Sequence, residues 1–100
     1  MRYDVEIWDG QLRLVDPRTG RVKSTLVSNA VAFGSDGEYI VVVDSNGRAS
    51  LFDAETGTAK GSVGPAGVVG CSISGGQVVL MHRDGRTSSH DARAGASGKA

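Results

Sequence analysis

Two histidines in the last third of the chain could do metal chemistry. His82 and His90 lie eight residues apart, with Arg83, Asp84 and Arg86 between them. Imidazole nitrogens are common ligands of zinc and copper, so the pair could share an ion if both side chains faced one side of a hairpin. Because two histidines without a third ligand make a weak site, we predict no bound metal. Instead we expect His90 to be half buried and hydrogen-bonded.

Aspartates recur at positions that could supply acidic ligands. Asp16, Asp53 and Asp91 occupy one position of an internal repeat, but three separate repeats do not make a cluster. We expect each to cap its own turn by accepting backbone N–H bonds. The segment 44–47 begins like a calcium loop, yet the residues after it form a predicted strand. It is therefore interpreted as a type I′ hairpin turn.

No arrangement of residues predicts catalysis. The single cysteine, Cys71, lies in a predicted innermost strand and is expected to be a small buried hydrophobe. The chain has no Gly-x-Ser-x-Gly elbow, and the glycine-rich segment 61–67 lacks the Gly-Lys-Ser/Thr ending of a phosphate loop. The sequence predicts neither an enzyme nor a cofactor.

Charge and hydropathy exclude further classes of protein. Eleven basic residues balance eleven acidic ones and aromatic residues make up 5% of the chain, so nucleic-acid binding is unlikely on composition. No apolar stretch approaches the roughly 18–20 residues of a membrane span. The N-terminus lacks a signal peptide, and one unpaired cysteine suits a reducing compartment. We expect a cytoplasmic location and no membrane partner.

The spacing of the glycines predicts which secondary-structure elements position the candidate residues named above. The chain has 15 glycines and 2 prolines, and its longest glycine-free run, 21–33, is broken by Ser28-Asn29. Between the glycines stand short β-branched runs such as 39–43 and 78–81, which are typical of strands. We predict an all-β protein, an antiparallel meander of ten or eleven short strands.

The strands fall into an internal repeat. Gly10, Gly47 and Gly85 set a period of 37 and then 38 residues, and the same alignment pairs Val5 with Val42 and Leu14 with Leu51. One domain, 1–96, would hold units at about 3–26, 29–63 and 67–97, with a frayed tail at 97–100. The complete unit predicts strands at 30–34, 38–44, 48–53 and 58–63, which is the four-stranded blade of a β-propeller.

Two segments of the complete unit resemble the WD-repeat class of β-propellers. Residues 31–40 are similar to the first hairpin of such a blade, and residues 48–57 to its third strand and closing turn. The family's Trp-Asp pair stands here as Val15-Asp16, Phe52-Asp53 and His90-Asp91, which keeps the aspartate and never the tryptophan. The family's Gly-His pair, and the side-chain network that depends on it, are absent. The resemblance implies blade geometry.

About 2.75 blades cannot close a ring, since propellers typically have 4–8 blades. Several chains could complete one ring, which makes a homo-oligomer the expected state. The strands could instead close on themselves as a small β-barrel or sandwich. A third alternative is that the chain is a fragment of a longer protein.

The scaffold favours a non-catalytic module that binds another protein through its turns and loops. Trp8 stands beside a hairpin turn, and its repeat counterparts Ser45 and Arg83 are polar. We therefore expect Trp8 to face solvent or a partner. The alternative is that it covers the edge of the first blade. The alternative function is an oligomeric lectin-like propeller for carbohydrates or small ligands. The candidate partner-binding residues are Trp8, Arg83, Arg86 and His90.

Overall fold

The computed structural model describes residues 3–64 and 66–92, and within them it contains ten strands and no α-helix. The prediction of an all-β chain is therefore confirmed. The end of the third predicted unit and the tail 97–100 lie outside the described residues. The strands are β1 Asp4–Trp8, β2 Gln11–Val15, β3 Val22–Val27, β4 Ala30–Ser35, β5 Tyr39–Asp44, β6 Ala49–Asp53, β7 Ala59–Val63, β8 Val68–Ser74, β9 Gln77–His82 and β10 Thr87–Asp91.

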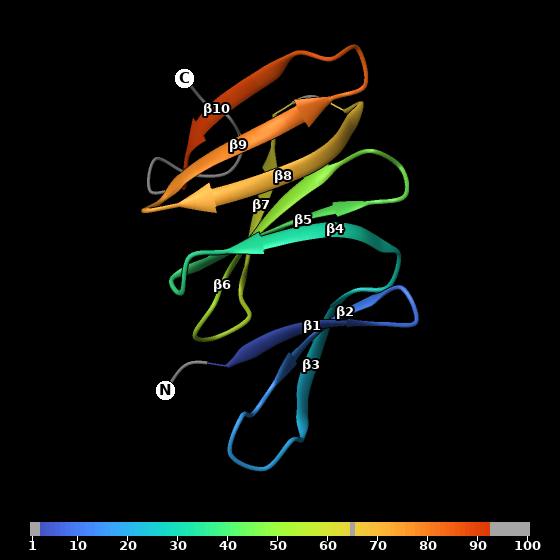
Figure 1. The fold of residues 1–100 in the computed structure, drawn as a ribbon. Coiled ribbons are helices and arrows are strands. Elements are labelled where there is room, and N and C mark those ends of the chain that lie inside the picture. The colour runs from blue at the N-terminus through green and yellow to red at the C-terminus, as the bar shows by residue number, and fades with distance from the viewer. Residues whose placement is uncertain (1–2, 65, 93–100) are drawn as a thin grey trace.

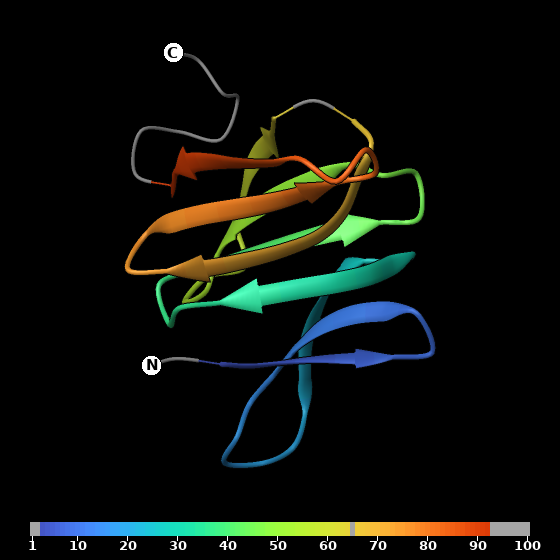
Figure 2. The same cartoon turned by 45° about the horizontal axis from the view of Figure 1, so that its top comes forward.

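The strands form three separate antiparallel sheets that follow one another along the chain (Figure 1). The first sheet has the order β1-β2-β3, the second β4-β5-β6-β7, and the third β8-β9-β10. The sheets lie one beside the next in chain order, and the first strand of the second sheet, β4, runs alongside β8 of the third (Figure 2). Since no strand of the described chain pairs across sheets, the alternative of a self-closed barrel is wrong.

The middle sheet is buried on both faces through strand β5. Alternate side chains of a strand point to opposite faces, and here both sets are apolar. Ile40 and Val42 pack with Leu12 and Leu14 of the first sheet, while Val41 and Val43 pack toward the third sheet. All four β5 side chains are at most 1% exposed. The run 40–43 is therefore continuously apolar because it has no solvent side.

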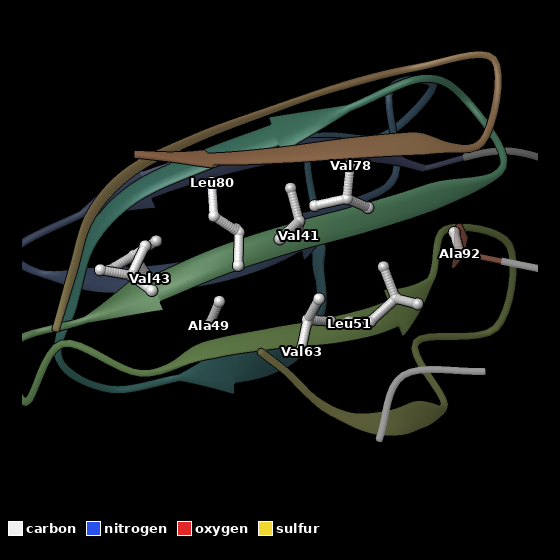
Figure 3. Close-up of a cluster of buried hydrophobic side chains, with 9 residues drawn as sticks. Val41, Val43, Ala49, Leu51, Val63, Val78, Leu80 and Ala92 are labelled. Carbon is white, nitrogen blue, oxygen red and sulfur yellow. The ribbon is translucent and has the colours of Figure 1, made fainter. Parts of the chain in front are cut away.

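The larger hydrophobic cluster fills the space between the second and third sheets (Figure 3). Leu51 and Val63 project from the second sheet, and Val78 and Leu80 meet them from the third. All four are at most 2% exposed. Packing of this kind, at roughly 1.5–3 kcal/mol for each fully buried aliphatic side chain, is what joins consecutive sheets.

The two outer sheets turn polar side chains away from the middle sheet. In the first sheet Leu12 and Leu14 point inward, so Arg13 points outward, where it forms an ion pair with Glu6. In the third sheet Thr87 and Ser89 stand exposed on the outer face. Their repeat counterparts in the middle sheet are the buried Ala49 and Leu51. The same outer faces also carry exposed apolar side chains, Trp8 in the first sheet and Met81 in the third.

The first hairpin has a shorter turn than the other two. Trp8 pairs directly with Gln11, and both Asp9 (φ 53°) and Gly10 (φ 77°) have positive φ, as a type I′ turn requires. In the turn 44–47 only Gly47 has positive φ, and the Asp44 N–H bonds the Arg48 carbonyl. The predicted type I′ turn at 44–47 is therefore wrong, and that hairpin closes with a longer loop ending in a left-handed glycine.

This difference in loop length shifts the repeat by one residue in β1. Val5 lies opposite Leu14, and Val41 lies opposite Leu51, so Val5 corresponds to Val41 and not to Val42. A one-residue slip moves every side chain to the other face of a sheet. Trp8 accordingly corresponds to Asp44 and His82, and its predicted correspondence with Ser45 and Arg83 is wrong.

Aspartates stabilise the turns, as predicted. Asp16 Oδ1 accepts the Arg18 N–H at 2.8 Å, and Asp53 Oδ1 accepts the N–H groups of Glu55 and Thr56 at 2.8 and 3.2 Å. These bonds satisfy backbone donors that the strands leave unpaired. Asp91 is the last residue of β10, and the prediction that it caps a turn concerns residues beyond 92, outside the described part of the chain.

Asp36 connects two sheets through its carboxylate. Its Oδ1 accepts the N–H groups of Glu38 and Tyr39 within the β4–β5 turn, and its Oδ2 accepts the Gly76 N–H of the β8–β9 turn at 2.7 Å. Partial burial by itself raises the pKa of Asp36, but these backbone donors outweigh it and hold the pKa below its ordinary value of 3.8. The charged form is thus favoured in the folded protein.

Replacing Asp36 with asparagine should destabilise the fold by about 1 kcal/mol near neutral pH, because the charge-assisted bond to Gly76 is lost. Because the pKa of Asp36 is lower in the folded state, its ionisation stabilises the fold at pH values above the unfolded-state pKa. This stabilisation is lost as the pH falls through the folded-state pKa. Urea unfolding should therefore separate the variant from the parent at pH 7 but not near pH 2. Asp84→Asn, which changes only a turn bond and an exposed ion pair within a single hairpin, is the control. An equal loss at both pH values would contradict this account.

Gly47→Val should be more damaging than Gly85→Val. Both glycines have positive φ, at 81° and 90°, so either valine costs roughly 1–2 kcal/mol in backbone strain. A Cβ at Gly47 would also lie 3.2 Å from the Gly67 nitrogen, whereas a Cβ at Gly85 meets nothing within 4 Å. We expect thermal unfolding to place Gly47→Val below Gly85→Val by at least about 1 kcal/mol. Equal melting temperatures of the two variants would show that the close contact between Gly47 and Gly67 does not add to the cost of a side chain at position 47.

Candidate functional site

A depression of about 450 Å³ lies over the β9–β10 hairpin. One side is formed by Ala66 and Gly67, in the link that leads into β8. The other side is the hairpin itself, which contributes His82, Arg83, Asp84, Arg86, Thr87 and Ser88. Of the four predicted partner-binding residues, Arg83 and Arg86 line this depression directly.

Backbone bonds hold the hairpin in place. The His82 N–H donates to the Arg86 carbonyl and the Gly85 N–H to the His82 carbonyl, at 2.8 and 2.9 Å. The Arg83 N–H bonds the Gly67 carbonyl at 2.9 Å, which ties the tip of the hairpin to the link before β8. Gly85, with a φ of 90°, makes the tight turn possible. Both walls of the depression are thus fixed to each other through backbone.

The rim of the depression carries two guanidinium groups. Arg83 and Arg86 are exposed, and the Arg86 Nε atom lies 3.8 Å from the Asp84 Oδ2 atom. An exposed pair at that distance contributes little, so it leaves the Arg86 guanidinium available. Guanidinium groups present a planar fork of donors that matches carboxylates and phosphates. The rim is therefore suited to an anionic group.

Behind the rim, Ser88 links the two histidines. The Ser88 Oγ atom lies 2.7 Å from His82 Nε2 and 3.0 Å from His90 Nε2. Both imidazoles therefore lie on one face of the hairpin. His90 is half-buried and hydrogen-bonded, as predicted, and it joins the site through Ser88. Sequence reasoning missed Ser88, although its placement two residues before His90 in a strand is the signal for a shared face.

Trp8 lies away from this hairpin, at the end of β1 in the first sheet. Its side chain is 64% exposed, so the prediction that it faces outward is confirmed. The Arg13 guanidinium lies 5.8 Å from the centre of its ring, within the range of a cation–π contact. The structure thus brings three of the predicted residues to one hairpin and leaves Trp8 on another sheet.

Cys71 belongs to the packing and not to the site. It lies in β8, half-buried against the larger hydrophobic cluster, with its Sγ atom 3.8 Å from the Val41 carbonyl. Burial raises the pKa of the Cys71 thiol to about 11. The thiolate, which is the nucleophilic form, is therefore scarce at neutral pH. This agrees with the prediction of a small apolar packing residue.

Within residues 3–64 and 66–92, no three side chains of the histidine, cysteine, aspartate and glutamate types gather in a way that could hold a metal ion. None of the elements in this part of the chain is a helix with the length and hydropathy needed to cross a membrane.

Comparison with solved structures relates the fold to β-propellers. The chain is similar to the computationally designed Ika4 protein (15% identity, TM-score 0.68), covering 87% of this chain and 63% of that one. It is similar to the designed Ika8 protein (16%, TM-score 0.73), covering 95% and 33%. It is also similar to BamB from Moraxella catarrhalis (20%, TM-score 0.59), covering 91% and 34%. In each case the chain spans less than two thirds of the solved chain.

These likenesses show a propeller-like fold and nothing finer. No protein-family model matches the chain, and no curated protein matches it. The sheets are thus propeller-like blades, in agreement with the predicted repeat of four-stranded units.

Proposed function

We propose that this chain is a non-catalytic protein-interaction module, and that its β9–β10 hairpin binds an acidic segment of a partner protein. The observation that carries the proposal is the pair of exposed guanidiniums, Arg83 and Arg86, on the rim of the depression. The Arg83 backbone is fixed to Gly67. A charged group on a fixed backbone loses less entropy on binding than one on a loose loop.

Three features of the depression support a carboxylate-bearing ligand. Each guanidinium can donate two parallel N–H bonds to one carboxylate. Among the described residues that line the depression, Asp84 alone carries a carboxylate, and its weak exposed contact with Arg86 is easily exchanged. His82 and Ser88, which also line the depression, offer further hydrogen-bonding groups. An extended peptide with two or more acidic side chains would satisfy this set.

The WD-repeat relationship is part of the proposal. Asp16 and Asp53 stand at the position where the family has its aspartate, and both cap turns. Propeller scaffolds of this class present turns and loops as contact surfaces, which is an argument by analogy of fold. A location in the cytoplasm suits such a module, and we retain it as an expectation.

Association of copies also belongs to the proposal. A neighbour stacked on the outer face of the first sheet would bury the Arg13–Glu6 ion pair, which disfavours blade-on-blade contact at that face. Strand edges are the alternative contact, because β1 has a single neighbour within the described residues. We therefore propose that copies associate edge to edge.

The acidic-segment proposal is tested with a fluorescein-labelled deca-glutamate peptide, measured by fluorescence anisotropy in EDTA. The double variant Arg83→Gln/Arg86→Gln should weaken binding at least about tenfold, in keeping with two charge-assisted bonds. The matched control Arg18→Gln/Arg21→Gln removes two exposed arginines from the β2–β3 turn and should change binding less than about twofold.

An equal loss in both double variants would show that only general charge is being sensed, and would overturn the assignment to the β9–β10 hairpin. The lectin-like alternative is tested by a glycan array. A specific sugar signal that Trp8→Ala abolishes would replace the protein-binding proposal.

Light scattering on a gel-filtration column tests the association of copies. We expect a mass of two or more chains, against 10.3 kDa for one. A proline at Glu6, in the middle of β1, should return the species toward the single-chain mass if β1 is the contact edge. Circular dichroism confirms that the variant keeps its strands. A parent of single-chain mass would remove the proposal of edge-to-edge association.

A further inference from the structure

A second depression, of about 270 Å³, adjoins the one over the β9–β10 hairpin. Arg83 lines both, so the two meet at this residue. The second depression is also lined by Val31 of β4, by Val69 of β8 and by the turn 44–47. Small-molecule pockets are usually larger, at roughly 300–1,000 Å³. The second depression is therefore suited to one side chain of a longer segment that is held elsewhere as well.

A β-bulge exposes each of the two valines. The pairing of β4 with β5 shifts between Ala30 and Ala32, which leaves Val31 as the extra residue. The pairing of β8 with β9 shifts in the same way and leaves Val69 as the extra residue. The two side chains are 58% and 52% exposed. Bulges at sheet edges commonly redirect a side chain next to a functional site.

The two bulged strands lie side by side. β4 ends the second sheet, β8 ends the third, and the two strands run next to each other (Figure 2). Val31 and Val69 thus form one apolar surface beside Arg83, which we call the Val31–Val69 patch. Single exposed apolar residues need no explanation, but neighbouring ones on adjacent elements are typical of contact surfaces.

We propose that the acidic segment bound by Arg83 and Arg86 also carries an aliphatic side chain, and that this side chain docks on the Val31–Val69 patch. The inference rests on the proposed function and specifies the chemistry of the partner. The partner segment is extended, and acidic residues flank a leucine, isoleucine or valine. Because alternate side chains of an extended chain point to the same side, such a segment can present acidic and aliphatic groups to the protein together.

Backbone bonds fix the walls of the second depression before anything binds. The Ser45 N–H donates to the Asn29 carbonyl, which ties the β5–β6 turn to the link before β4. The Val68 N–H donates to the Gly47 carbonyl, which ties the same turn to the start of β8. Both bonds are 2.9 Å long. Little ordering is then needed on binding, so less of the interaction free energy is lost.

The charges around the second depression favour an uncharged side chain within it. Asp44 lines this depression and would repel a carboxylate placed there. Its own Oδ1 atom accepts the N–H groups of Asn46 and Arg48, at 2.9 and 3.1 Å, so Asp44 is already occupied by its turn. The acidic side chains of the partner are thus directed to the arginine rim, and the aliphatic one to the valines.

Two labelled ten-residue peptides test the inference by fluorescence anisotropy. Both are runs of glutamate, interrupted at the fifth position by leucine in one and by asparagine in the other, so they have equal charge and similar shape. The parent chain should bind the leucine peptide about fivefold more tightly, because the patch removes part of the leucine from water. Glutamates on both sides of the leucine allow either direction of binding.

Valine-to-serine variants locate the preference for leucine. Val31→Ser and Val69→Ser should each reduce the fivefold preference to about twofold or less, and should leave the affinity for the asparagine peptide unchanged. Val22→Ser is the matched control. It removes another exposed valine, 45% exposed and located in β3 of the first sheet. This variant should keep the full preference.

NMR of the parent's valine methyl groups gives a readout that needs no variant. The leucine peptide should shift the Val31 and Val69 methyl signals more than the asparagine peptide does, and the Val22 signals equally little with both. Equal shifts of the patch signals with the two peptides would overturn the inference.

The binding results separate this inference from the proposed function. If the parent binds the asparagine peptide but does not prefer leucine, or if both patch variants keep the preference, the inference alone is overturned. If the asparagine peptide does not bind, the acidic-segment proposal fails and the inference fails with it. A patch variant that keeps the preference and lowers the mass in solution would assign the patch to a second copy of the chain, which also overturns the inference.

Discussion

Two-sided burial of β5 is the constraint on which the rest of the structure depends. Ile40 and Val42 need apolar partners on one side, and Val41 and Val43 need them on the other. A single sheet cannot provide both, so the chain must supply a sheet before and a sheet after. The flanking sheets in turn need only one apolar face each. This is why the middle unit is rich in valine while the outer units can carry charge and hydroxyl groups on their far sides.

The same constraint positions the candidate site. Val78 and Leu80 point from β9 into the larger cluster, and His82 follows them on the same face at the end of the strand. The apolar surface ends there, so His82, Ser88 and His90 lie where the packing between sheets gives way to solvent. Hydrogen bonding among these side chains satisfies polar groups that partial burial would otherwise penalise. The site is thus the polar continuation of the interface that holds the third sheet to the second.

The fold could be predicted from the sequence because its signals are local. Glycine-bounded runs of β-branched residues mark strands, and the recurring turn residues mark a repeat. The register could not be predicted, because Asp9-Gly10 and Asn46-Gly47 are similar turn dipeptides and yet they close loops of different length. Whether such a dipeptide forms a type I′ turn depends on which residues of the two flanking strands pair with each other, and this is seen only in the structure. The side chains that each sheet turns outward could not be predicted for the same reason, because their faces are set only once the register is known. Ser88 was overlooked because its contact with His82 of the neighbouring strand can be foreseen only once the pairing of β9 with β10 is known.

Every hydrogen-bonded pair of strands in the described chain joins neighbours in sequence. Closing such a pair requires a loop of only a few residues, which costs little chain entropy. Each sheet can therefore assemble from nearby hairpins before it meets the next one, and the long-range part of folding is confined to face-to-face packing of finished sheets. Topologies with short sequence separation between partners fold fast relative to other all-β proteins. In such a chain the ends of β3 and β7 mark the places where one cooperative unit ends and the next begins.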